Sequence, residues 1–338
     1  MIHTYGDIGN MTAGYYSRQL LKHAVPVLIL ERFATRKTLP QRETKVIEFR
    51  RSKPFTAATT PLVEGKTPES SDFGYDSVSV QIQQYGDYAE ITDVIQDTSK
   101  DSVLNDMSER QGEQIGETKE KLMWDVLLAG TSVWYGGSVA SRAAVTTTSV
   151  LDANAQRRIV SGLHKQKAKH IKTVLGGSED YETYAVEASY CAITHTDALP
   201  TIRDLKANDN SYFVPTSRYG TGMGTTGPHE KGAFEEVRYI CSPDHDGFRG
   251  AGAAQSGDTH YKTSGKTDVY AALYLGRDSF GAIVLRGKNA VMPMVLNPGV
   301  PRAGDPLGQR GSVGWKMWHA CVVLNDAWQS RFEFAVKK

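Results

Sequence analysis

Residues 45–82 read KVIEFRRSKPFTAATTPLVEGKTPESSDFGYDSVSVQI, and this stretch decides the predicted fold. Within residues 45–50, Ile47 and Phe49 fall on one face, and residues 77–82 alternate between polar and aliphatic side chains, which is the period of a β-strand. A stretch rich in Pro and Thr separates the two segments. We therefore expect a long β-hairpin that projects from the body, because such a loop is uncommon in a compact domain unless it is functional.

The segment after the hairpin is expected to form one long amphipathic helix over residues 100–129. Its apolar residues recur at spacings of three and four, and at 1.5 Å per residue the helix is a rod of about 45 Å. Gly112 and Gly116 lie four residues apart, which favours the close approach of another backbone. The opposite face is expected to carry the acidic residues Asp106, Glu109, Glu113, Glu117 and Glu120.

A second helix is expected over residues 152–175, closed by Gly176 and Gly177. Its polar surface is basic, with no acidic residue between Ala153 and Thr173. The basic residues are Arg157, Arg158, Lys165, Lys167, Lys169 and Lys172, accompanied by His164 and His170. Clustered lysines bind nucleic acid without sequence preference, so a DNA-facing surface is one interpretation. An ordinary solvated helix face is the other.

The rest of the chain is rich in predicted strands. Residues 190–193, 236–240 and 269–275 are dominated by β-branched, aromatic and aliphatic side chains. Residues 244–266 carry many glycines and are expected to form a loop. Residues 315–336 are expected to form a long terminal strand or a strand pair.

The composition is that of a folded chain, because 40% of its 338 residues are hydrophobic, 23% are charged and the formal net charge is +1. This length fits two or three subdomains. The longest apolar run, residues 25–30, is too short to span a bilayer, and no secretory signal opens the chain. Three widely spaced cysteines, Cys191, Cys241 and Cys321, favour a reducing compartment such as a cytoplasm over a disulfide scaffold.

Two adjacent blocks carry opposite charge. Residues 32–53 have a net charge of +6, and residues 64–125 have a net charge of −10. Separation on this scale indicates complementary surfaces, within one chain or between copies. Two independently solvated faces are the alternative.

The sequence contains no recognisable catalytic constellation. Residues 222–227 match the G-x-G-x-x-G pattern, but no strand precedes them and a proline stands where the dinucleotide-binding helix should open. His195 and Asp197 have the residue types of an acid–base pair, yet no nucleophile with a matching base accompanies them.

The best candidate for metal ligands is the run Asp244, His245 and Asp246, beside Cys241. A polar turn is the favoured interpretation, because no second cluster at ligand spacing supports a metal site. We therefore predict no catalytic residue, no cofactor and no metal site.

Several segments together resemble the signature of one protein family. They are VIEFRRSKP at 46–54, AATTPLVEG at 57–65, QYGDY at 84–88, ITD at 91–93, GEQ at 112–114, HTD at 195–197 with Asp204 and Leu205, and DPLGQRGSVGWK at 305–316. The family is that of the major capsid proteins of N-four-type short-tailed phages. The segments occur in the same order over most of the chain, and the last is long and specific.

That resemblance implies an α+β fold, the Hong Kong phage-type major capsid fold. Its parts are an N-terminal arm, an extended β-hairpin loop, a peripheral domain with a long spine helix, and an axial domain. The corresponding ranges are 1–33 for the arm, 34–82 for the extended loop, 83–180 for the peripheral domain with its spine helix at 100–129, 181–295 for the axial domain, and 296–338 for the return strands of the peripheral domain. Residues 244–266 match no part of the family pattern.

The resemblance also implies a function. Copies of the chain would bind one another as pentamers and hexamers of an icosahedral phage head that encloses double-stranded DNA without sequence specificity. Scaffolding, decoration and portal proteins are the implied partners, the virion is the implied location, and the host cytoplasm is the implied place of assembly. No enzymatic activity, cofactor or membrane is implied. An encapsulin-like shell for cargo enzymes is the alternative, and a soluble enzyme that uses residues 244–246 is a third reading.

In this fold the extended loop of one subunit lies over the peripheral domain of its neighbour, which suggests the contacting residues. We hypothesise that basic residues of the loop face acidic residues of the spine helix of an adjacent copy. The basic residues are Arg42, Lys45, Arg50, Arg51 and Lys53, and the acidic ones are Glu109, Glu113, Glu117 and Glu120. The basic helix described above is hypothesised to face the packaged DNA.

Overall fold

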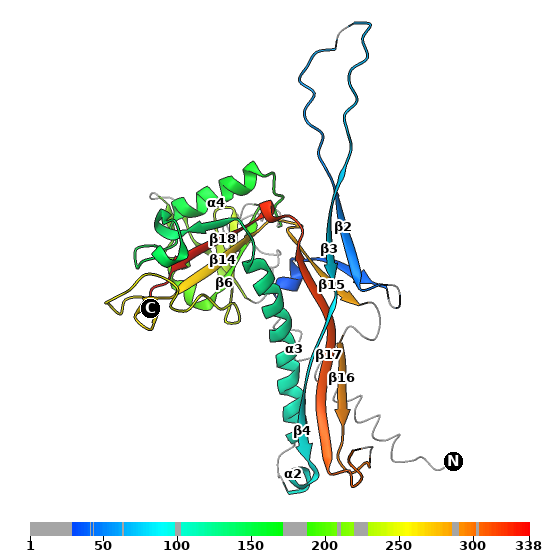
Figure 1. Cartoon of the computed structure of the whole chain (residues 1–338). Coiled ribbons are helices and arrows are strands. Elements are labelled where there is room, and N and C mark those ends of the chain that lie inside the picture. The colour runs from blue at the N-terminus through cyan, green and yellow to red at the C-terminus, as the bar shows by residue number, and fades with distance from the viewer. Residues whose placement is uncertain are drawn as a thin grey trace.

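The computed structural model describes residues 29–40, 42, 44–62, 64–98, 103–171, 188–207, 211–219, 229–285, 291–301 and 304–338. Two large β-sheets lie side by side, one long helix packs against both, and a hairpin rises away from them (Figure 1). The arm expected over residues 1–33 falls outside the described residues up to position 28.

The first sheet has five strands and is built around one long strand, β17 (Arg310–Val323). β4 (Gln83–Thr92) pairs antiparallel along one edge of β17. The other edge is shared by β16 (Val291–Leu296), opposite the first half of β17, and β15 (Phe280–Leu285), opposite its second half. β1 (Thr35–Leu39) then pairs in parallel with β15.

The long helix is α3 (Val103–Leu128), and it lies along this sheet after the short helix α2 (Asp93–Thr98). It confirms the helix expected over residues 100–129 within the described part of the chain, because residues 100–102 lie outside it. Both of its interior glycines are buried, as close packing requires. The Nε2 amide of Gln111 donates to the Val313 carbonyl of β17 at 2.6 Å, which ties the helix to the sheet.

The second sheet has seven strands. In spatial order they are β5 (Val133–Tyr135), β18 (Gln329–Ala335), β14 (Val269–Leu275), β6 (Tyr190–His195), β11 (Val237–Ser242), β10 (Glu230–Phe234) and β9 (Val214–Pro215). Every residue of β6, β11 and β14 is buried. The reason is that α4 (Ala153–Lys165) covers one face of the sheet and the last turns of α3 cover the other.

α4 begins where the sequence predicts and ends ten residues earlier than the expected position 175. The Asp152 carboxylate caps it by accepting the N–H of Ala155 at 2.9 Å. It ends at Lys165 because Lys167 adopts a left-handed conformation with a φ of 55°, which reverses the chain. The helix expected over 152–175 is therefore wrong over residues 166–171, and its last residues with the closing Gly176 and Gly177 lie outside the described residues.

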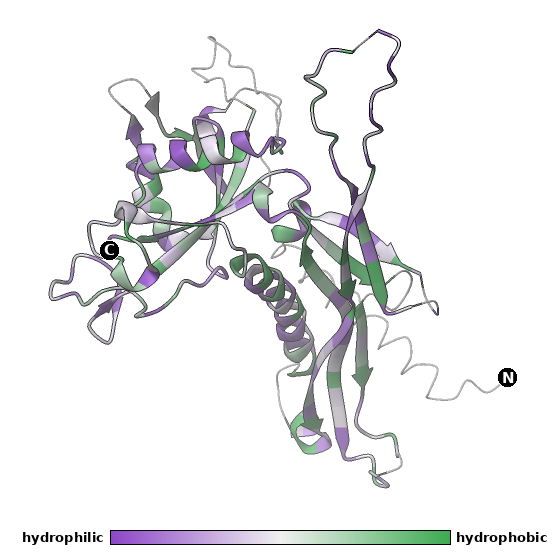
Figure 2. Cartoon of the chain, turned by 45° about the horizontal axis from the view of Figure 1, so that its top comes forward, coloured by the Kyte–Doolittle hydropathy of each residue, from purple (hydrophilic) through white to green (hydrophobic). Residues whose placement is uncertain are grey.

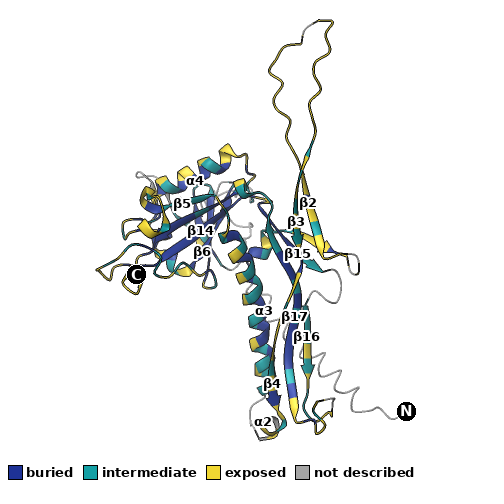
Figure 3. Ribbon diagram, in the orientation of Figure 1, coloured by how far each residue is buried: buried dark blue, intermediate teal, exposed yellow. Residues whose placement is uncertain are grey.

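The predicted hairpin is confirmed. β2 (Val46–Ser52) pairs antiparallel with β3 (Tyr75–Gln81), from Val46 opposite Gln81 to Ser52 opposite Tyr75. Its base is held by Phe49, which is buried with Leu39 and Ile283 of the first sheet. The loop beyond the paired strands mixes hydrophilic and hydrophobic residues and is exposed along its length (Figures 2 and 3).

The remaining elements are short. They are α5 (Leu199–Arg203), the strand pairs β7 (Lys206–Ala207) with β8 (Ser211–Tyr212) and β12 (Lys262–Thr263) with β13 (Lys266–Thr267), and the 3₁₀ turns η2 (Leu30–Arg32), η3 (Gly136–Ser138), η4 (Arg142–Ala144), η6 (Thr196–Ala198), η7 (Thr216–Arg218) and η8 (Asp326–Trp328). None of the described helices combines the length and the apolar character of a membrane span.

Sheet pairing groups the chain differently from the expected domain ranges. β15, within 181–295, belongs to the five-stranded sheet, whereas β5 and α4, within 83–180, belong with the seven-stranded sheet. The terminal strand pair also divides, because β17 lies in the first sheet and β18 in the second.

Candidate interaction surfaces

The basic residues of the hairpin lie on an exposed surface. Arg42 and Lys45 precede β2, Arg50 and Arg51 are on it, and Lys53 follows it, and all five are exposed. Part of their charge is balanced within the hairpin. Arg50 pairs with Glu48 at 3.1 Å, and Arg51 and Lys53 approach Asp76 of β3 at 3.4 and 3.3 Å. The hydrogen bond from Lys53 lowers the pKa of the Asp76 carboxyl.

Three of the four acidic residues proposed on α3 are accessible to differing degrees. Glu117 is exposed, whereas Glu109 and Glu113 are half-buried. Glu113 pairs with Arg110 one turn earlier at 2.9 Å. These three glutamates lie four residues apart and share one face of the helix.

The prediction that Glu120 lies on the outer acidic face is wrong, because its side chain is fully buried. Its carboxylate accepts the backbone N–H of Leu30 at 3.0 Å and that of Ile29 at 3.2 Å. It also lies 3.0 Å from Nε2 of His245, whose ring stacks on Trp124. Glu120 therefore fastens residues 29–30 to α3 and takes no part in an exposed contact.

The spacing explains why Glu120 differs. Positions 109, 113 and 117 advance by four, but position 120 comes three residues after the last of them. It therefore falls on the buried stripe, four residues after Gly116 and three before Met123. The spacing of Glu120 from Gly116 and Met123 therefore indicates its burial in the sequence itself.

The hairpin loop carries exposed aromatic side chains that the sequence reading did not single out. Every described residue from Arg50 to Phe73 is exposed. Phe55 and Phe73 face each other across the loop with ring centroids 5.6 Å apart, and Tyr75 meets Phe73 edge-on at 4.9 Å. These three rings are 49–61% exposed. Exposed aromatic clusters mark interaction sites more often than isolated apolar residues do. The signal in the sequence is the presence of large aromatics in a Pro- and Thr-rich loop.

The far end of the first sheet, opposite the hairpin in Figure 1, also exposes apolar side chains. They come from α2, β16 and the loop before β17, and are Val94, Ile95, Met294, Leu296, Val300 and Leu307. The molecule thus exposes apolar groups at both ends of its long axis.

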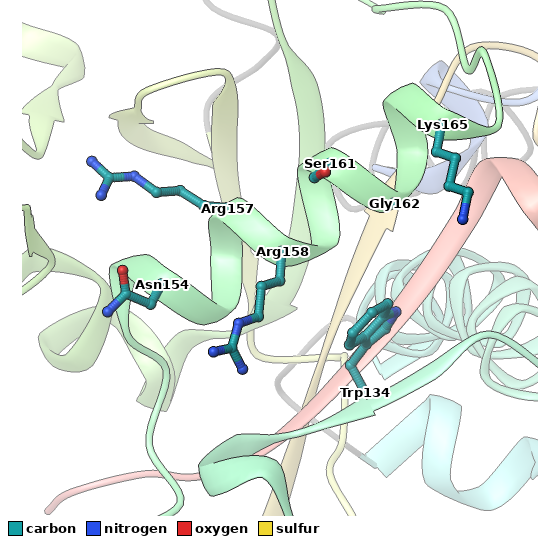
Figure 4. A pocket seen from close by; sticks show the side chains of 7 residues that line it. All are labelled: Trp134, Asn154, Arg157, Arg158, Ser161, Gly162 and Lys165. Atoms are coloured by element: carbon teal, nitrogen blue, oxygen red, sulfur yellow. The ribbon is translucent and has the colours of Figure 1, made fainter.

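The basic residues predicted on the second helix lie partly on α4 and partly beyond its end. Arg157, Arg158 and Lys165 are exposed on α4 and line a shallow hollow with the partly exposed Trp134 (Figure 4). Lys167 and Lys169 are exposed beyond the end of the helix, and Lys172 lies outside the described residues. Arg157 donates a hydrogen bond to the Glu235 carboxylate, and this bond raises the pKa of the Arg157 guanidinium.

Comparison with known families gives a match over most of the chain. A family model described as phage capsid protein matches residues 75–337, which contain α3 and most of both sheets. The chain belongs to the phage capsid protein family.

A curated relative supports the match. The major capsid protein of Pseudomonas phage KPP21 is 23% identical over 261 residues. The aligned region is 73% of this chain and 65% of that protein, so the chain spans about two thirds of its relative's length.

Solved phage capsids share the fold. The capsid of Ralstonia phage GP4 gives a TM-score of 0.64 at 13% identity and covers 91% of this chain and 88% of that chain. The head structure of Helicobacter pylori bacteriophage KHP40 gives 0.55 at 9% identity, covering 89% of this chain and 87% of that chain. The predicted α+β fold of the Hong Kong phage type is thereby confirmed, and the N-four-type subgroup stays a prediction.

In this capsid-family chain, the candidate metal ligands at residues 244–246 and Cys241 do not converge. His245 is buried against Glu120, whereas the Asp246 side chain is 62% exposed. Burial raises the pKa of the Cys241 thiol to about 12, so it stays protonated and is a poor ligand. Residues 243–244 form a turn, and His245 and Asp246 lie in different environments, so the favoured interpretation as a polar turn fits these residues and the alternative of metal ligands does not.

His195 and Asp197 form a structural pair in the phage capsid fold seen here. Nδ1 of His195 accepts the N–H of Asp197 at 3.1 Å, and the Asp197 carboxylate accepts the Tyr270 hydroxyl at 2.7 Å. Both therefore hold the turn after β6. Residues 222–227 lie outside the described residues.

A different set of potential metal ligands does come together. Within the described part of the chain, His164, His170 and Glu236 place one ligand atom each within 4.8 Å of one another. The two histidines flank the end of α4, and Glu236 lies between β10 and β11.

Proposed function

We propose that this chain is the major capsid protein of a tailed-phage head, whose copies assemble as pentamers and hexamers into an icosahedral shell around double-stranded DNA. The observation that carries the proposal is the family match over residues 75–337. The relatives are phage capsids, which favours a phage head over the encapsulin-like alternative. The chain acts as a structural component of the virion, and no step requires catalysis.

Exposed apolar side chains at two ends of the chain support assembly. Phe55 and Phe73 of the hairpin loop are 59% and 49% exposed, and Leu307 at the far end of the first sheet is 76% exposed. Exposed apolar groups that gather in this way mark surfaces that a partner covers. These surfaces therefore suit a subunit that is completed by its neighbours.

The two sheets suggest how the domains of the capsid fold are assigned. The peripheral domain would consist of the five-stranded sheet with α3, and the axial domain would consist of the seven-stranded sheet with α4. The hairpin of β2 and β3 would be the extended loop. This division follows the strand pairing, and so moves β15, β5 and β18 across the ranges expected from the sequence.

The charge of the hairpin supplies one contact between subunits. Its basic residues would face Glu109, Glu113 and Glu117 on α3 of a neighbour, and Glu120 is no longer among them. Exposed ion pairs contribute roughly 0.2–1 kcal/mol each, so the contact gains its weight from repetition around the shell.

The basic surface at α4 would face the packaged DNA. Arg158, Lys165, Lys167 and Lys169 are exposed there, and Trp134 adds an aromatic surface. Such contacts neutralise phosphates without reading bases. Scaffolding, decoration and portal proteins are further partners of a head built in the host cytoplasm.

Electron microscopy of the full chain, expressed alone at physiological and at high salt, tests this function. We expect closed shells at physiological salt and fewer at high salt, because screening weakens the charged contact. Co-expression with the scaffolding protein of the same phage tests whether the chain needs that protein to form shells. Monomers under all of these conditions would refute the proposal.

A further inference from the structure

Three side chains that can ligate a metal meet at the C-terminal end of α4. Nε2 of His164 lies 2.5 Å from Oε2 of Glu236, and Nε2 of His170 lies 3.6 Å from the same oxygen. All three side chains are partly accessible, at 45%, 31% and 35% for His164, His170 and Glu236. The cluster therefore lies at the protein surface, although the Nε2 atom of His170 itself is buried.

The local backbone brings these residues together. His164 is on the last turn of α4, and the left-handed Lys167 turns the chain back so that His170 returns beside it, with ring centroids 5.4 Å apart. Glu236 sits in the tight turn between β10 and β11, where its carbonyl accepts the N–H of Tyr190 at 2.9 Å. A helix end, a strand and a hairpin turn thus position the three ligands, and the negative end of the helix dipole favours a cation there.

The short contact between His164 and Glu236 can hold either a proton or a metal ion. A neutral imidazole with its proton on Nε2 donates to the Glu236 carboxylate at 2.5 Å. With a metal ion on Nε2, the proton of the ring lies on Nδ1 instead. There it faces the Tyr190 hydroxyl oxygen at 3.5 Å, and that hydroxyl donates its own proton to the Ala168 carbonyl at 2.9 Å.

The surroundings of His170 favour a metal ion over a proton between His164 and Glu236. Its Nε2 atom is buried and, among the described residues, has no hydrogen-bond partner. A separation of 3.6 Å from Glu236 is too long for a hydrogen bond. Two ligands of a tetrahedral zinc ion, each about 2.0–2.1 Å from the metal, lie about 3.4 Å apart. A proton on Nε2 of His164 leaves Nε2 of His170 without a partner, whereas an ion shared by both rings and Glu236 satisfies both.

We propose that His164, His170 and Glu236 bind a divalent transition-metal ion of the zinc class, with solvent or another ligand in the fourth position. Two imidazoles and one carboxylate are a donor set suited to zinc. The His164–Glu236 separation has to widen by about 1 Å, which partly exposed side chains accommodate. The ion would fasten the end of α4 to the turn between β10 and β11, on the surface of the second sheet.

Calorimetric titration of the metal-free, untagged, unassembled chain with zinc chloride tests this site. Wild type is expected to bind zinc stoichiometrically and magnesium not at all. His170→Ala and Glu236→Gln should each weaken zinc binding more than tenfold. Tyr190→Phe should weaken it about tenfold, the low end of the effect of removing a partner of a metal-bound histidine. Glu235→Gln is the matched control, because the adjacent Glu235 pairs with Arg157 outside the cluster.

Cobalt substitution of the wild-type chain gives a second readout that needs no variant. A site of this kind should give the intense visible absorption of four-coordinate cobalt, whereas a weak octahedral spectrum would overturn the proposal. The absence of zinc binding by wild type, or unchanged binding in both His170→Ala and Glu236→Gln, would overturn it too. These measurements use single subunits, so their outcome is independent of shell formation.

Discussion

At the scale of single residues, the informative side chains are buried charges whose partners come from distant parts of the chain. Glu120 binds two backbone N–H groups and His245, and Glu333 binds Arg142 through two contacts of 2.7 Å and Arg331 through one of 2.8 Å. A buried charge needs such partners, because an unpaired one is expensive to desolvate. Glu120 therefore joins residues 29–30 to the helix, and Glu333 joins η4 to β18.

Replacing Glu120 tests the first of these networks. Glu120→Ala leaves two backbone N–H groups and His245 without their acceptor, so we expect a loss of about 3–5 kcal/mol in the free energy of unfolding. Urea denaturation of unassembled subunits measures it. Glu117→Ala is the matched control, one turn away on the exposed face, and should change the value by no more than about 0.5 kcal/mol. Equal effects of the two substitutions would mean that Glu120 is not buried as described.

At the scale of elements, local periodicity predicts which helices and strands form, but it does not predict which strands pair with one another. The strand expected at 269–275 is β14, and the hairpin and α3 stand where alternation and helical spacing indicated. The end of α4 was missed because the residue that takes the left-handed conformation is Lys167, and lysine gives no such signal. No local pattern says that β17 and β18 join different sheets, since that depends on pairing between distant strands.

The residues proposed to make contacts are likewise predictable only in part from local patterns. Alternation and charge counting located the basic hairpin, whose residues are exposed as expected. They misplaced Glu120, because charge alone does not reveal which face of a helix is buried. The ligand cluster was invisible from the sequence, since Glu236 is 72 residues from His164 and reaches it only through the fold.

Charge reversal on β2 tests the hairpin as an assembly element. Arg50→Glu with Arg51→Glu should leave the subunit folded, because the two side chains are exposed and their ion pairs are worth roughly 0.2–1 kcal/mol each. The same change should sharply reduce the yield of shells, since like charges would then face α3 of the neighbour. Sedimentation separates shells from subunits, and circular dichroism checks folding.

A control for net charge alone is Lys266→Glu with Lys337→Glu, which changes the charge equally at two exposed positions outside the hairpin and the first sheet, in β13 and after β18. We expect this pair to leave more shells than the hairpin pair. A wild-type yield from Arg50→Glu with Arg51→Glu would remove the hairpin charges from the assembly contact.

At the scale of the whole molecule, the residues that stabilise the fold and those expected to make the shell are separate. The buried clusters lie between the sheets and the helices, and the hairpin loop adds no buried residue between Arg50 and Phe73 among those described. A chain built in this way can lose its loop and keep its core. That separation allows assembly to be tested without the ambiguity of an unfolded variant.

Shortening the loop is the corresponding experiment. The N–H of Lys53 donates to the Gly74 carbonyl at 2.9 Å, so the two strands already meet where the loop leaves them. Replacing residues 54–73 with Asn-Gly, the dipeptide preferred in two-residue hairpin turns, should therefore preserve β2 and β3. The unfolding free energy should not fall, and it should rise by up to about 2 kcal/mol, because a tenfold shorter loop costs less closure entropy. Shell formation should be lost, because Phe55, Phe73 and the reach of the loop are removed together.

A second variant keeps the length of residues 54–73 but replaces them with a Gly-Ser sequence, which separates reach from side-chain contact. If the exposed aromatic rings bind the neighbour, this variant also fails to form shells while remaining folded. If it assembles and the shortened chain does not, the loop acts through its length alone. Normal shells from the shortened chain, seen by electron microscopy, would show that assembly does not use the loop. The proposed role of the hairpin would then be withdrawn, although membership of the capsid family would stand.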